Sequence, residues 1–319
     1  MDYFLKIGLI LVFLLSGCVQ AEENQLEKVG LLLSNPIDDN SWNSKAYQGI
    51  LNIQSKLDVQ VFVKEDVNSR DQIFDAIESF SNEGINLVFG HGHSFGEPFM
   101  ELNDKHPQIH FVVFNTEVEG DNITSLHFEG YAMGYFAGLL ASEMTVTDRL
   151  GVIAAFPFQP EVEGFVEGAT LNNPEVDVQV DYVYSWENVQ KAIDFFHEMN
   201  KSGVDIYYPA GDGYHIAIIE KIKESENYAI GYVGDHIDLG ESTVLTSTVQ
   251  HVEKLYEYVA NSYVNNTLDK GNLYFDFAEE VISLGEFSNE VPDAIRQQIE
   301  GAIEVYIDSG LLPHEKSGK

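Results

Sequence analysis

The chain has 319 residues, 44% of them hydrophobic, and its 52 acidic and 17 basic residues give a formal charge of −35. This length is typical of about two domains, and the hydrophobic content is sufficient for buried cores. So negative a chain repels phosphate backbones, which argues against direct binding of DNA or RNA. The sequence contains a single cysteine, which excludes an intrachain disulfide and a cysteine-based zinc site.

The N-terminus has the pattern of a bacterial lipoprotein signal. Lys6 precedes an apolar run from Ile7 to Leu15, and Ser16-Gly17-Cys18 follows. The run is short for a membrane-spanning helix, and small residues before a lone cysteine are typical of cleavage with lipid attachment to the thiol. We therefore expect residues 1–17 to be removed and Cys18 to anchor the protein to the outer face of the cell membrane. An uncleaved anchor, the alternative, would also tether the chain to a membrane.

The first predicted strand and helix position an aromatic side chain. The apolar run Val29–Leu33 predicts a buried strand. The loop containing Asp38-Asp39-Asn40 has residues typical of a turn, and Ser41 is placed to cap a helix. An apolar stripe at helical spacing follows: Trp42, Ala46, Ile50, Ile53 and Leu57. Trp42 lies in the first helical turn after a strand, where open α/β sheets bind ligands. It is alternatively only the first member of the core stripe.

The chain carries an internal repeat, because residues 28–92 align with 149–213 at an offset of 119 to 121 residues. Gly84-Ile85-Asn86 corresponds to Gly203-Val204-Asp205, and Gly90-His91-Gly92 corresponds to Gly211-Asp212-Gly213. Alternating strands and helices predict a parallel sheet with helices on both faces in each copy. The predicted strands are 28–33, 58–64, 85–90, 109–115, 149–155, 177–184, 204–208 and 228–233. The predicted helices are 41–56, 70–83, 95–105, 159–171, 187–201 and 214–225.

Two further strands connect the copies. Ile123–Phe128 and Thr243–Val249 are predicted to cross between them, each followed by a helix, at 130–144 and 251–265. The expected fold is therefore α/β, with two doubly wound parallel-sheet lobes joined by crossing strands and a ligand cleft where the strand ends meet. The expected division is a signal peptide at 1–17, a tether at 18–26, lobe 1 at 27–122 and 250–280, and lobe 2 at 123–249 and 281–319.

One motif raises the question of catalysis. Gly92-His93-Ser94-Phe95-Gly96 matches the Gly-x-Ser-x-Gly elbow of serine hydrolases, with acid and base candidates at Asp212 or Asp235 and at His236 or His251. The matching turn in the second copy, Gly211-Asp212-Gly213, has the glycines but no serine. A tight turn shared by both lobes therefore explains the glycines, and we expect no catalytic residue.

Cofactor and metal sites are not indicated either. Gly90-x-Gly92 follows the third strand rather than the first and lacks the third glycine of a dinucleotide site. His91, His93, His106 and His110 have no carboxylate at a spacing typical of a metal site, so hydrogen-bonded or solvated roles are expected for them.

A second tryptophan matches the first. Trp186 follows the strand 177–184 at the start of a helix, on the cleft side of the second copy. Two indole rings on opposing lobes could hold a flat ring between them, since offset stacking is favourable. Trp186 is alternatively a hydrophobic staple at the N-terminus of its helix.

Several motifs identify a family resemblance that covers nearly the whole chain after Cys18. They are Asp39-Asn40-Ser41-Trp42-Asn43, Gly90-His91-Gly92, Pro160-Glu161-Val162-Glu163-Gly164-Phe165, Tyr208-Pro209-Ala210-Gly211-Asp212-Gly213-Tyr214, Ala229-Ile230-Gly231-Tyr232-Val233 and Leu245-Thr246-Ser247-Thr248-Val249-Gln250. The chain resembles the basic membrane protein (PnrA-like) family of substrate-binding lipoproteins, which is similar to purine-nucleoside receptors. This resemblance implies a type I periplasmic-binding fold, capture of a nucleoside between two aromatic rings and delivery to an ABC permease.

The resemblance also implies which residues bind the ligand. They are the ring Trp42 with Asn43 beside it, the ring Trp186, and polar groups at Asn115, Gly211, Asp212, Asp235 and Gln250. The family usually has Asp where Asn115 stands, an acidic residue at Val233 and Lys at Gln250. This cleft should therefore offer neutral amides, which can still bond a base edge or a hydroxyl.

Two functions follow from the sequence. The first is a lipid-anchored, extracytoplasmic solute-binding protein of an ABC transporter that binds a nucleoside-like aromatic solute and has no enzymatic activity. The alternative is a regulatory lipoprotein that promotes competence indirectly, through a partner and without transport. The negative charge of the chain indicates that such regulation would not act through direct contact with DNA.

Overall fold

The computed structural model describes residues 26–37 and 41–316. The expected signal at 1–17, the lipid-attachment residue Cys18 and the turn Asp38-Asp39-Asn40 lie outside these residues. Within the described ranges, no helix is both long enough and apolar enough to cross a bilayer.

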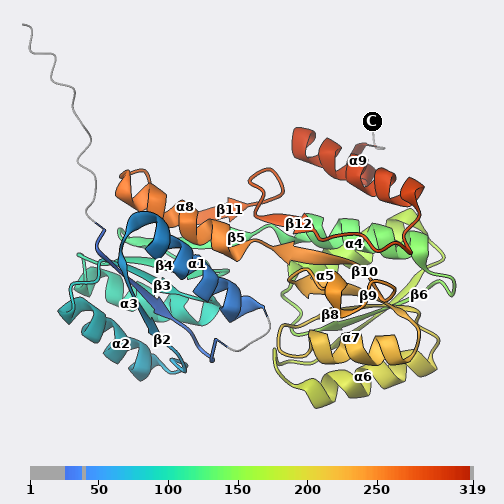
Figure 1. Cartoon of the computed structure of the whole chain (residues 1–319), viewed down its shortest axis with the longest axis horizontal. Coiled ribbons are helices and arrows are strands. Elements are labelled where there is room, and N and C mark those ends of the chain that lie inside the picture. The colour runs from blue at the N-terminus through green and yellow to red at the C-terminus, as the bar shows by residue number, and fades with distance from the viewer. Residues whose placement is uncertain (1–25, 38–40, 317–319) are drawn as a thin grey trace, which may run out of the picture.

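The chain forms two α/β lobes side by side, each built on a six-stranded sheet (Figure 1). The first sheet has the order β11 (Gly271–Phe275), β5 (Ile123–Phe128), β4 (His110–Phe114), β3 (Leu87–Gly90), β1 (Lys28–Leu32) and β2 (Gln60–Lys64). The second has the order β12 (Ile282–Leu284), β10 (Val244–Gln250), β9 (Tyr228–Val233), β8 (Ile206–Ala210), β6 (Arg149–Ala154) and β7 (Asp177–Tyr182). Neighbouring strands are parallel, except that β12 runs antiparallel to β10. The expected fold, of the type I periplasmic-binding-protein class, is confirmed.

Helices cover both faces of each sheet (Figure 1). The outer helices α2 (Arg70–Asn82) and α3 (Gly96–Leu102) form one apolar cluster with the first sheet, and α6 (Val189–Lys201) and α7 (His215–Glu224) form another with the second. A third cluster runs through both lobes. Its helices are α1 (Trp42–Leu57), α8 (Val252–Val264), α4 (Gly130–Met144), α5 (Pro160–Asn172) and α9 (Asp293–Ser309). The short helices are η1 (His93–Phe95), η2 (Asn103–Lys105), η3 (Ile237–Leu239) and α10 (Pro313–Lys316).

Local sequence signals explain where several helices begin. The Ser69 side chain accepts from the Gln72 amide while the Gln72 side chain accepts from the Ser69 amide, and this capping box starts α2. Pro160 occupies the first position of α5, where its missing N–H costs nothing. These signals are local, which is why the predicted strands and helices agree with the observed ones to within a few residues.

The expected lobe boundary at residue 123 requires correction. Ile123–Phe128 was expected in the second lobe, but it pairs in parallel with β4 and β11 in the first sheet. The chain leaves the first lobe only after Phe128, where α4 begins in the second. It returns after Gln250 into α8, and crosses again between β11 and β12. The strands β11 and β12 and the helix α9, which the repeat does not contain, were not predicted.

Glycines allow α4 and α5 to pack backbone against backbone in the second lobe. A Cβ atom on Gly134 would lie 1.9 Å from the Glu161 carbonyl oxygen, and one on Gly138 would lie 2.0 Å from that of Phe165. Gly164 and Gly168 approach α4 equally closely from the other side. The contact fixes the start of α5, and with it the side chain of Glu161, relative to the crossing point after β5.

Candidate functional site

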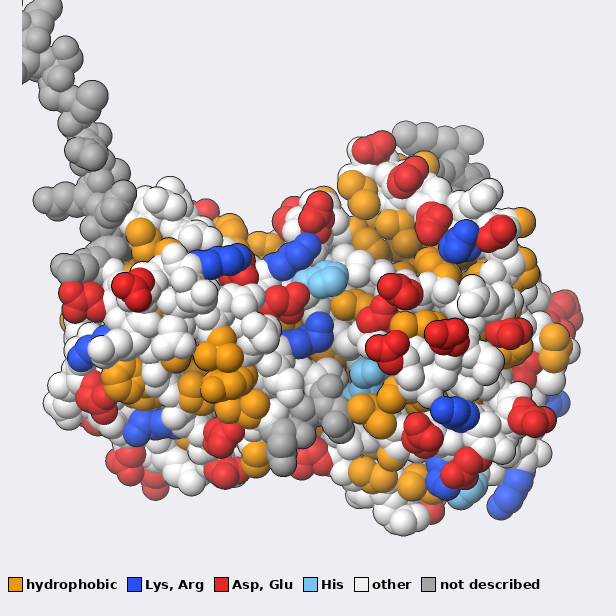
Figure 2. Space-filling view, viewed as in Figure 1, with side chains coloured by type: hydrophobic (Ala, Val, Ile, Leu, Met, Phe, Trp, Pro, Cys, Tyr) orange, Lys and Arg blue, Asp and Glu red, His pale blue; other side chains and the backbone are white. Residues whose placement is uncertain are grey.

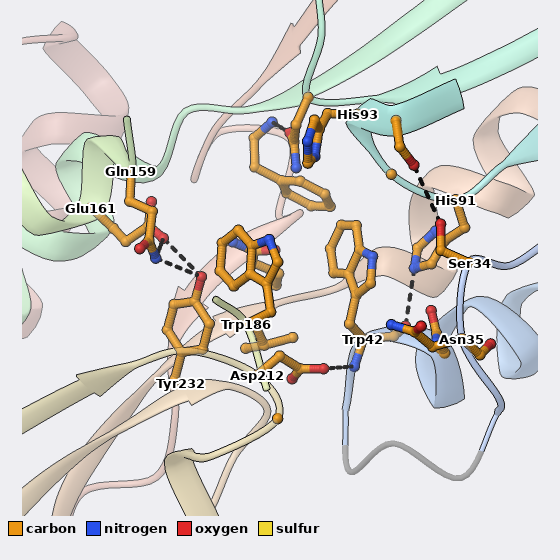
Figure 3. A pocket seen from close by; sticks show the side chains of 18 of the residues that line it. Ser34, Asn35, Trp42, His91, His93, Gln159, Glu161, Trp186, Asp212 and Tyr232 are labelled. Atoms are coloured by element: carbon orange, nitrogen blue, oxygen red, sulfur yellow. Dashed lines mark hydrogen bonds between the residues drawn. The ribbon is translucent and has the colours of Figure 1, made fainter. Parts of the chain in front are cut away.

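A cleft of about 400 Å³ lies between the lobes, at the carboxyl ends of the parallel strands. In open α/β sheets this is where ligands bind, because loops from adjacent strands converge there. The first lobe contributes Ser34, Asn35, Trp42, Asn43, His91, Gly92, His93, Ser94, Asn115, His127 and Phe128. The second contributes Phe158, Gln159, Pro160, Glu161, Trp186, Glu187, Asp212, Gly213, Tyr232, Val233 and Gln250. Figure 3 shows the two tryptophans facing the space between the lobes.

Trp42 forms the wall of the cleft on the first lobe. Its indole stacks on the His91 ring at 4.2 Å between centroids and meets the rings of Phe114 and Phe128 edge-on, at 6.0 and 6.1 Å. Farther along α1, Ala46 and Ile50 are buried in the core, as the stripe predicts. Trp42 therefore belongs both to the core stripe and to the cleft.

His91 stabilises Trp42 through its ring and through a hydrogen bond. The Trp42 carbonyl can only accept, so the His91 Nε2–H donates to it at 3.1 Å, and Nδ1 then accepts from the Tyr256 hydroxyl at 3.1 Å. Burial lowers the pKa of His91 to about 3. The ring therefore stays neutral near pH 7 and keeps this tautomer, which fixes the orientation of Trp42.

Trp186 forms the opposite wall. It lies in the loop between β7 and α6 rather than in the first helical turn. The centroid of its ring lies 5.4 Å from that of the Phe156 ring. Phe156 stacks on Phe158, which is 64% exposed and meets the His93 ring of the first lobe at the mouth of the cleft. An aromatic surface thus extends from the interior of the cleft to its rim.

A buried polar cluster lies at the same side of the cleft (Figure 3). The Glu161 carboxylate accepts from the Tyr232 hydroxyl at 2.9 Å and from the Gln159 amide at 3.1 Å. Burial, and next the charge of Glu161, raises the pKa of Tyr232 well above its usual value, so the hydroxyl remains a donor. The cluster provides hydrogen-bonding groups in an otherwise apolar part of the wall.

Two carboxylates of the second lobe accept hydrogen bonds from the first lobe across the cleft. The Asp212 carboxylate accepts from the Ser41 hydroxyl at 2.6 Å and from the Trp42 amide at 3.2 Å, and the Glu187 carboxylate accepts from the Asn35 amide. Ser41 occupies the N-cap position of α1 as predicted, but its own side chain caps no amide. The cap comes instead from Asp212 of the other lobe, because the Ser41 hydroxyl is oriented toward that carboxylate.

Six of the eight expected ligand-binding residues line the cleft: Trp42, Asn43, Asn115, Trp186, Asp212 and Gln250. Gly211 does not line it, because it forms the tight turn against the Tyr214 ring and only its neighbours reach the cavity. Asp235 lies outside the cleft as well. Its carboxylate accepts from the Glu286 amide at 2.8 Å and from the Ser247 hydroxyl at 3.3 Å, which fixes the loop after β12.

Two residues that line the cleft have a left-handed backbone conformation. Asn115 follows β4 with φ of 55°, and Val233 ends β9 with φ of 63°, at equivalent places in the two lobes. This left-handed region is unfavourable for a β-branched residue such as valine, at a cost of about 1–3 kcal/mol. Strained residues of this kind occur preferentially at ligand sites.

The serine-hydrolase alternative finds no support in the geometry. The hydroxyl of Ser94 lies 3.3 Å from that of Ser34, and no described histidine or carboxylate is hydrogen-bonded to it. The proposed bases are held elsewhere, His236 at the Tyr232 carbonyl and His251 at the Ser283 hydroxyl. Across 26–37 and 41–316, no group of three His, Cys, Asp or Glu side chains could hold a metal ion.

Sequence reasoning missed several lining residues. A solvated or hydrogen-bonded role was expected for His91, and it is hydrogen-bonded, but its position in the cleft wall beneath Trp42 was not predicted. Glu161 and Tyr232 appeared only within the family motifs, and Gln159 appeared in none of them. The sequence around Glu161 gave no distinctive signal, because Glu163 is a second acidic residue in the same first helical turn.

Comparison with known proteins gives a consistent result. The family model described as "ABC transporter substrate-binding protein PnrA-like" matches residues 26–316. The Transcriptional activator protein med of Bacillus subtilis is 44% identical over 96% of this chain and 98% of its own length. A Purine-binding protein of Brucella abortus is 26% identical over 96% of this chain and 87% of its own length.

A solved structure shares the fold. The crystal structure of a transcriptional activator of the comK gene from Bacillus halodurans superposes with a TM-score of 0.84 and is 52% identical. The superposition covers 90% of this chain and all of that one.

Proposed function

Because the chain belongs to the Bmp family of PnrA-like ABC transporter substrate-binding proteins, we propose that it captures a nucleoside-like aromatic solute between its lobes. The family is one of binding proteins rather than enzymes, so its members act by recognition and release of a solute. We further propose that Cys18 carries a lipid, that this lipid holds the protein on the outer face of the cell membrane, and that an ABC permease receives the solute.

One observation carries the proposal for the ligand. The only two tryptophans of the chain both line the cleft, one on each lobe, with amide side chains of Asn43, Asn115 and Gln250 around them. A flat ring stacks favourably on indole faces, and amides can both donate to and accept from the edge of a base. The relative named as a purine-binding protein supports a ligand of this class.

Tryptophan fluorescence tests this proposal directly, because both indoles report from the cleft. Titration of the chain lacking residues 1–18 with purines and nucleosides should change its emission saturably. Trp42→Ala and Trp186→Ala should each weaken binding, whereas Tyr258→Ala, an exposed aromatic on α8 outside the cleft, should not. A ligand at a hundred times its Kd stabilises the fold by about 2.7 kcal/mol, which a thermal melt detects. Failure of every purine and nucleoside in both assays would refute the proposal.

The similarity to med favours a second function, regulation through a partner. A Bacillus subtilis strain that lacks med and carries a comK reporter distinguishes solute binding from regulation through a partner. Restoration of the reporter by the wild-type chain and equally by Trp42→Ala would show regulation that does not need the cleft. Loss of restoration in Trp42→Ala and Trp186→Ala, with Tyr258→Ala active, would show that regulation depends on solute binding.

A further inference from the structure

Every charged side chain that lines the described part of the cleft, apart from the histidines, is acidic: Glu161, Glu187 and Asp212. Lys45, a largely buried lysine on α1, does not line the cavity and donates its ammonium to the Gln250 carbonyl at 2.9 Å. An anionic ligand would therefore leave water without finding a cation to pair with, which is costly.

Glu161 differs from the other two carboxylates. Asp212 and Glu187 accept hydrogen bonds across the cleft, from Ser41 and Asn35, and so contribute to closure. The bonds to Glu161 come from Tyr232 and Gln159 and both reach Oε1. Glu161 is 5% exposed, and no lysine or arginine within 26–37 and 41–316 forms an ion pair with it. A buried carboxylate without a cationic partner is unfavourable, and a cation brought by the ligand would offset that cost.

The aromatic walls favour the same charge. Trp42 and Trp186 bound the cleft together with Phe128, Phe158 and Tyr232, and indole faces attract cations most strongly among aromatic rings. Figure 2 shows acidic side chains spread over both lobes on the face in view, and the formal charge of −35 raises the local concentration of cations.

We propose that the ring captured between Trp42 and Trp186 carries a positive charge, as in an N-alkylated heterocycle, and that Glu161 is its counter-ion. This inference rests on the proposed function, because it concerns the same cleft, and it defines the solute class more narrowly. The carboxylate neutralises the ring charge while the indoles hold its two faces.

Matched ligand pairs test the charge preference on the unaltered protein. Fluorescence titration compares 1-methylnicotinamide with nicotinamide, and 7-methylguanosine with guanosine at pH 6, with guanosine monophosphate as the anion. We expect each cation to bind about tenfold more tightly than its neutral partner, and the anion more weakly than guanosine. Equal affinities within each pair would overturn this inference but leave the proposed function standing. No binding of any of these ring compounds would count against both.

A charge-removing variant tests the role of Glu161. Glu161→Gln keeps the acceptor oxygen for Tyr232 and Gln159, so the neutral ligands should bind within about threefold of wild type while the preference for cations is lost. Glu163→Gln removes one charge from an exposed position on the same helix and should keep the preference. A preference unchanged in a folded Glu161→Gln would overturn the counter-ion assignment. The ligand pairs on the wild-type chain decide the charge preference even if that variant does not fold.

Discussion

Asp212 of the second lobe accepts a hydrogen bond from the Ser41 hydroxyl of the first lobe at 2.6 Å, and its other carboxylate oxygen accepts from the Trp42 amide. One carboxylate thus caps α1 from across the cleft. A negative charge at a helix N-terminus is favourable, and this one reaches α1 only when the lobes are closed. The contact therefore stabilises the closed arrangement independently of what the cleft holds.

Removal of this contact should open the protein. Asp212→Ala should destabilise the closed arrangement by about 2 kcal/mol, because hydrogen bonds to a charged acceptor are lost. Since apparent affinity scales with the populated fraction of the competent state, solute binding should weaken as well. Small-angle X-ray scattering should show a larger radius of gyration than for Asp238→Ala, which removes an exposed carboxylate from η3. Identical radii for the two variants would contradict this role of Asp212.

Acid should destabilise the fold through four histidines whose pKa is lowered by the surrounding protein. Burial lowers the pKa to about 3 for His91 and to about 4 for His110, His215 and His236, against 6.5 when unfolded. Between these values the unfolded chain binds protons that the folded chain does not, so this stabilisation is present above pH 6.5 and is lost as the pH falls toward 4. The loss should approach about 1.4 kcal/mol per pH unit for each histidine. Urea unfolding at pH 7, 6, 5 and 4 measures it, and a flat profile would contradict the prediction.

Asp212 should make the fold more stable as the pH falls, which is the opposite of the effect of the histidines. Burial raises its pKa above the usual 3.8, so its ionisation opposes folding, and its contribution to stability grows as the pH falls through the raised pKa. Relative to Asp212→Asn, which does not titrate, the wild-type chain should gain stability on acidification. The difference in unfolding free energy between these two proteins, measured over the same pH series, isolates this single group from the histidines.

The contact between α4 and α5 should not tolerate a methyl group. Gly134→Ala would place a Cβ atom 1.9 Å from the Glu161 carbonyl oxygen, so the helices must separate, and we expect a loss of about 2–4 kcal/mol. Gly301→Ala in α9 is the matched control, because nothing lies within 4 Å of its added Cβ. It should be neutral or stabilise by up to about 1 kcal/mol through helix propensity. The melting temperature should therefore fall for Gly134→Ala but not for Gly301→Ala. Similar melting temperatures for the two variants would show that the close contact between α4 and α5 does not determine the stability of the fold.

The hydroxyl of Tyr256 should stabilise the position of Trp42 indirectly, through its hydrogen bond to His91. Tyr256→Phe leaves the buried His91 Nδ1 without its donor, which should cost about 1–3 kcal/mol and loosen the ring on which Trp42 stacks. Tryptophan emission should shift, and affinity for the solute should fall. Tyr274→Phe removes an exposed hydroxyl that bonds Glu117 and serves as the control. Unchanged emission in a destabilised Tyr256→Phe would limit Tyr256 to a structural role.

Local patterns in the sequence were sufficient for most of the architecture. The repeat of strands and helices predicted two parallel-sheet lobes, because periodicity and turn residues act within a few positions of one another. The same patterns placed Trp42 and Trp186 at strand ends, and both line the cleft. Pairing partners are not encoded locally, so the membership of Ile123–Phe128 in the first sheet was predicted wrongly.

The sequence alone therefore determined that Trp42 and Trp186 approach the cleft, since the strand ends of an open α/β sheet converge there. Tertiary structure decided what those residues do. Ser41 and Asp212 are 171 positions apart, and His91 and Tyr256 are 165 apart, so only the folded arrangement makes one pair an interlobe cap and the other a support for Trp42. Burial also depends on the folded arrangement. The lowered pKa of His91 and the enclosure of Glu161 arise from side chains far apart in the sequence that meet only when the lobe containing them has folded.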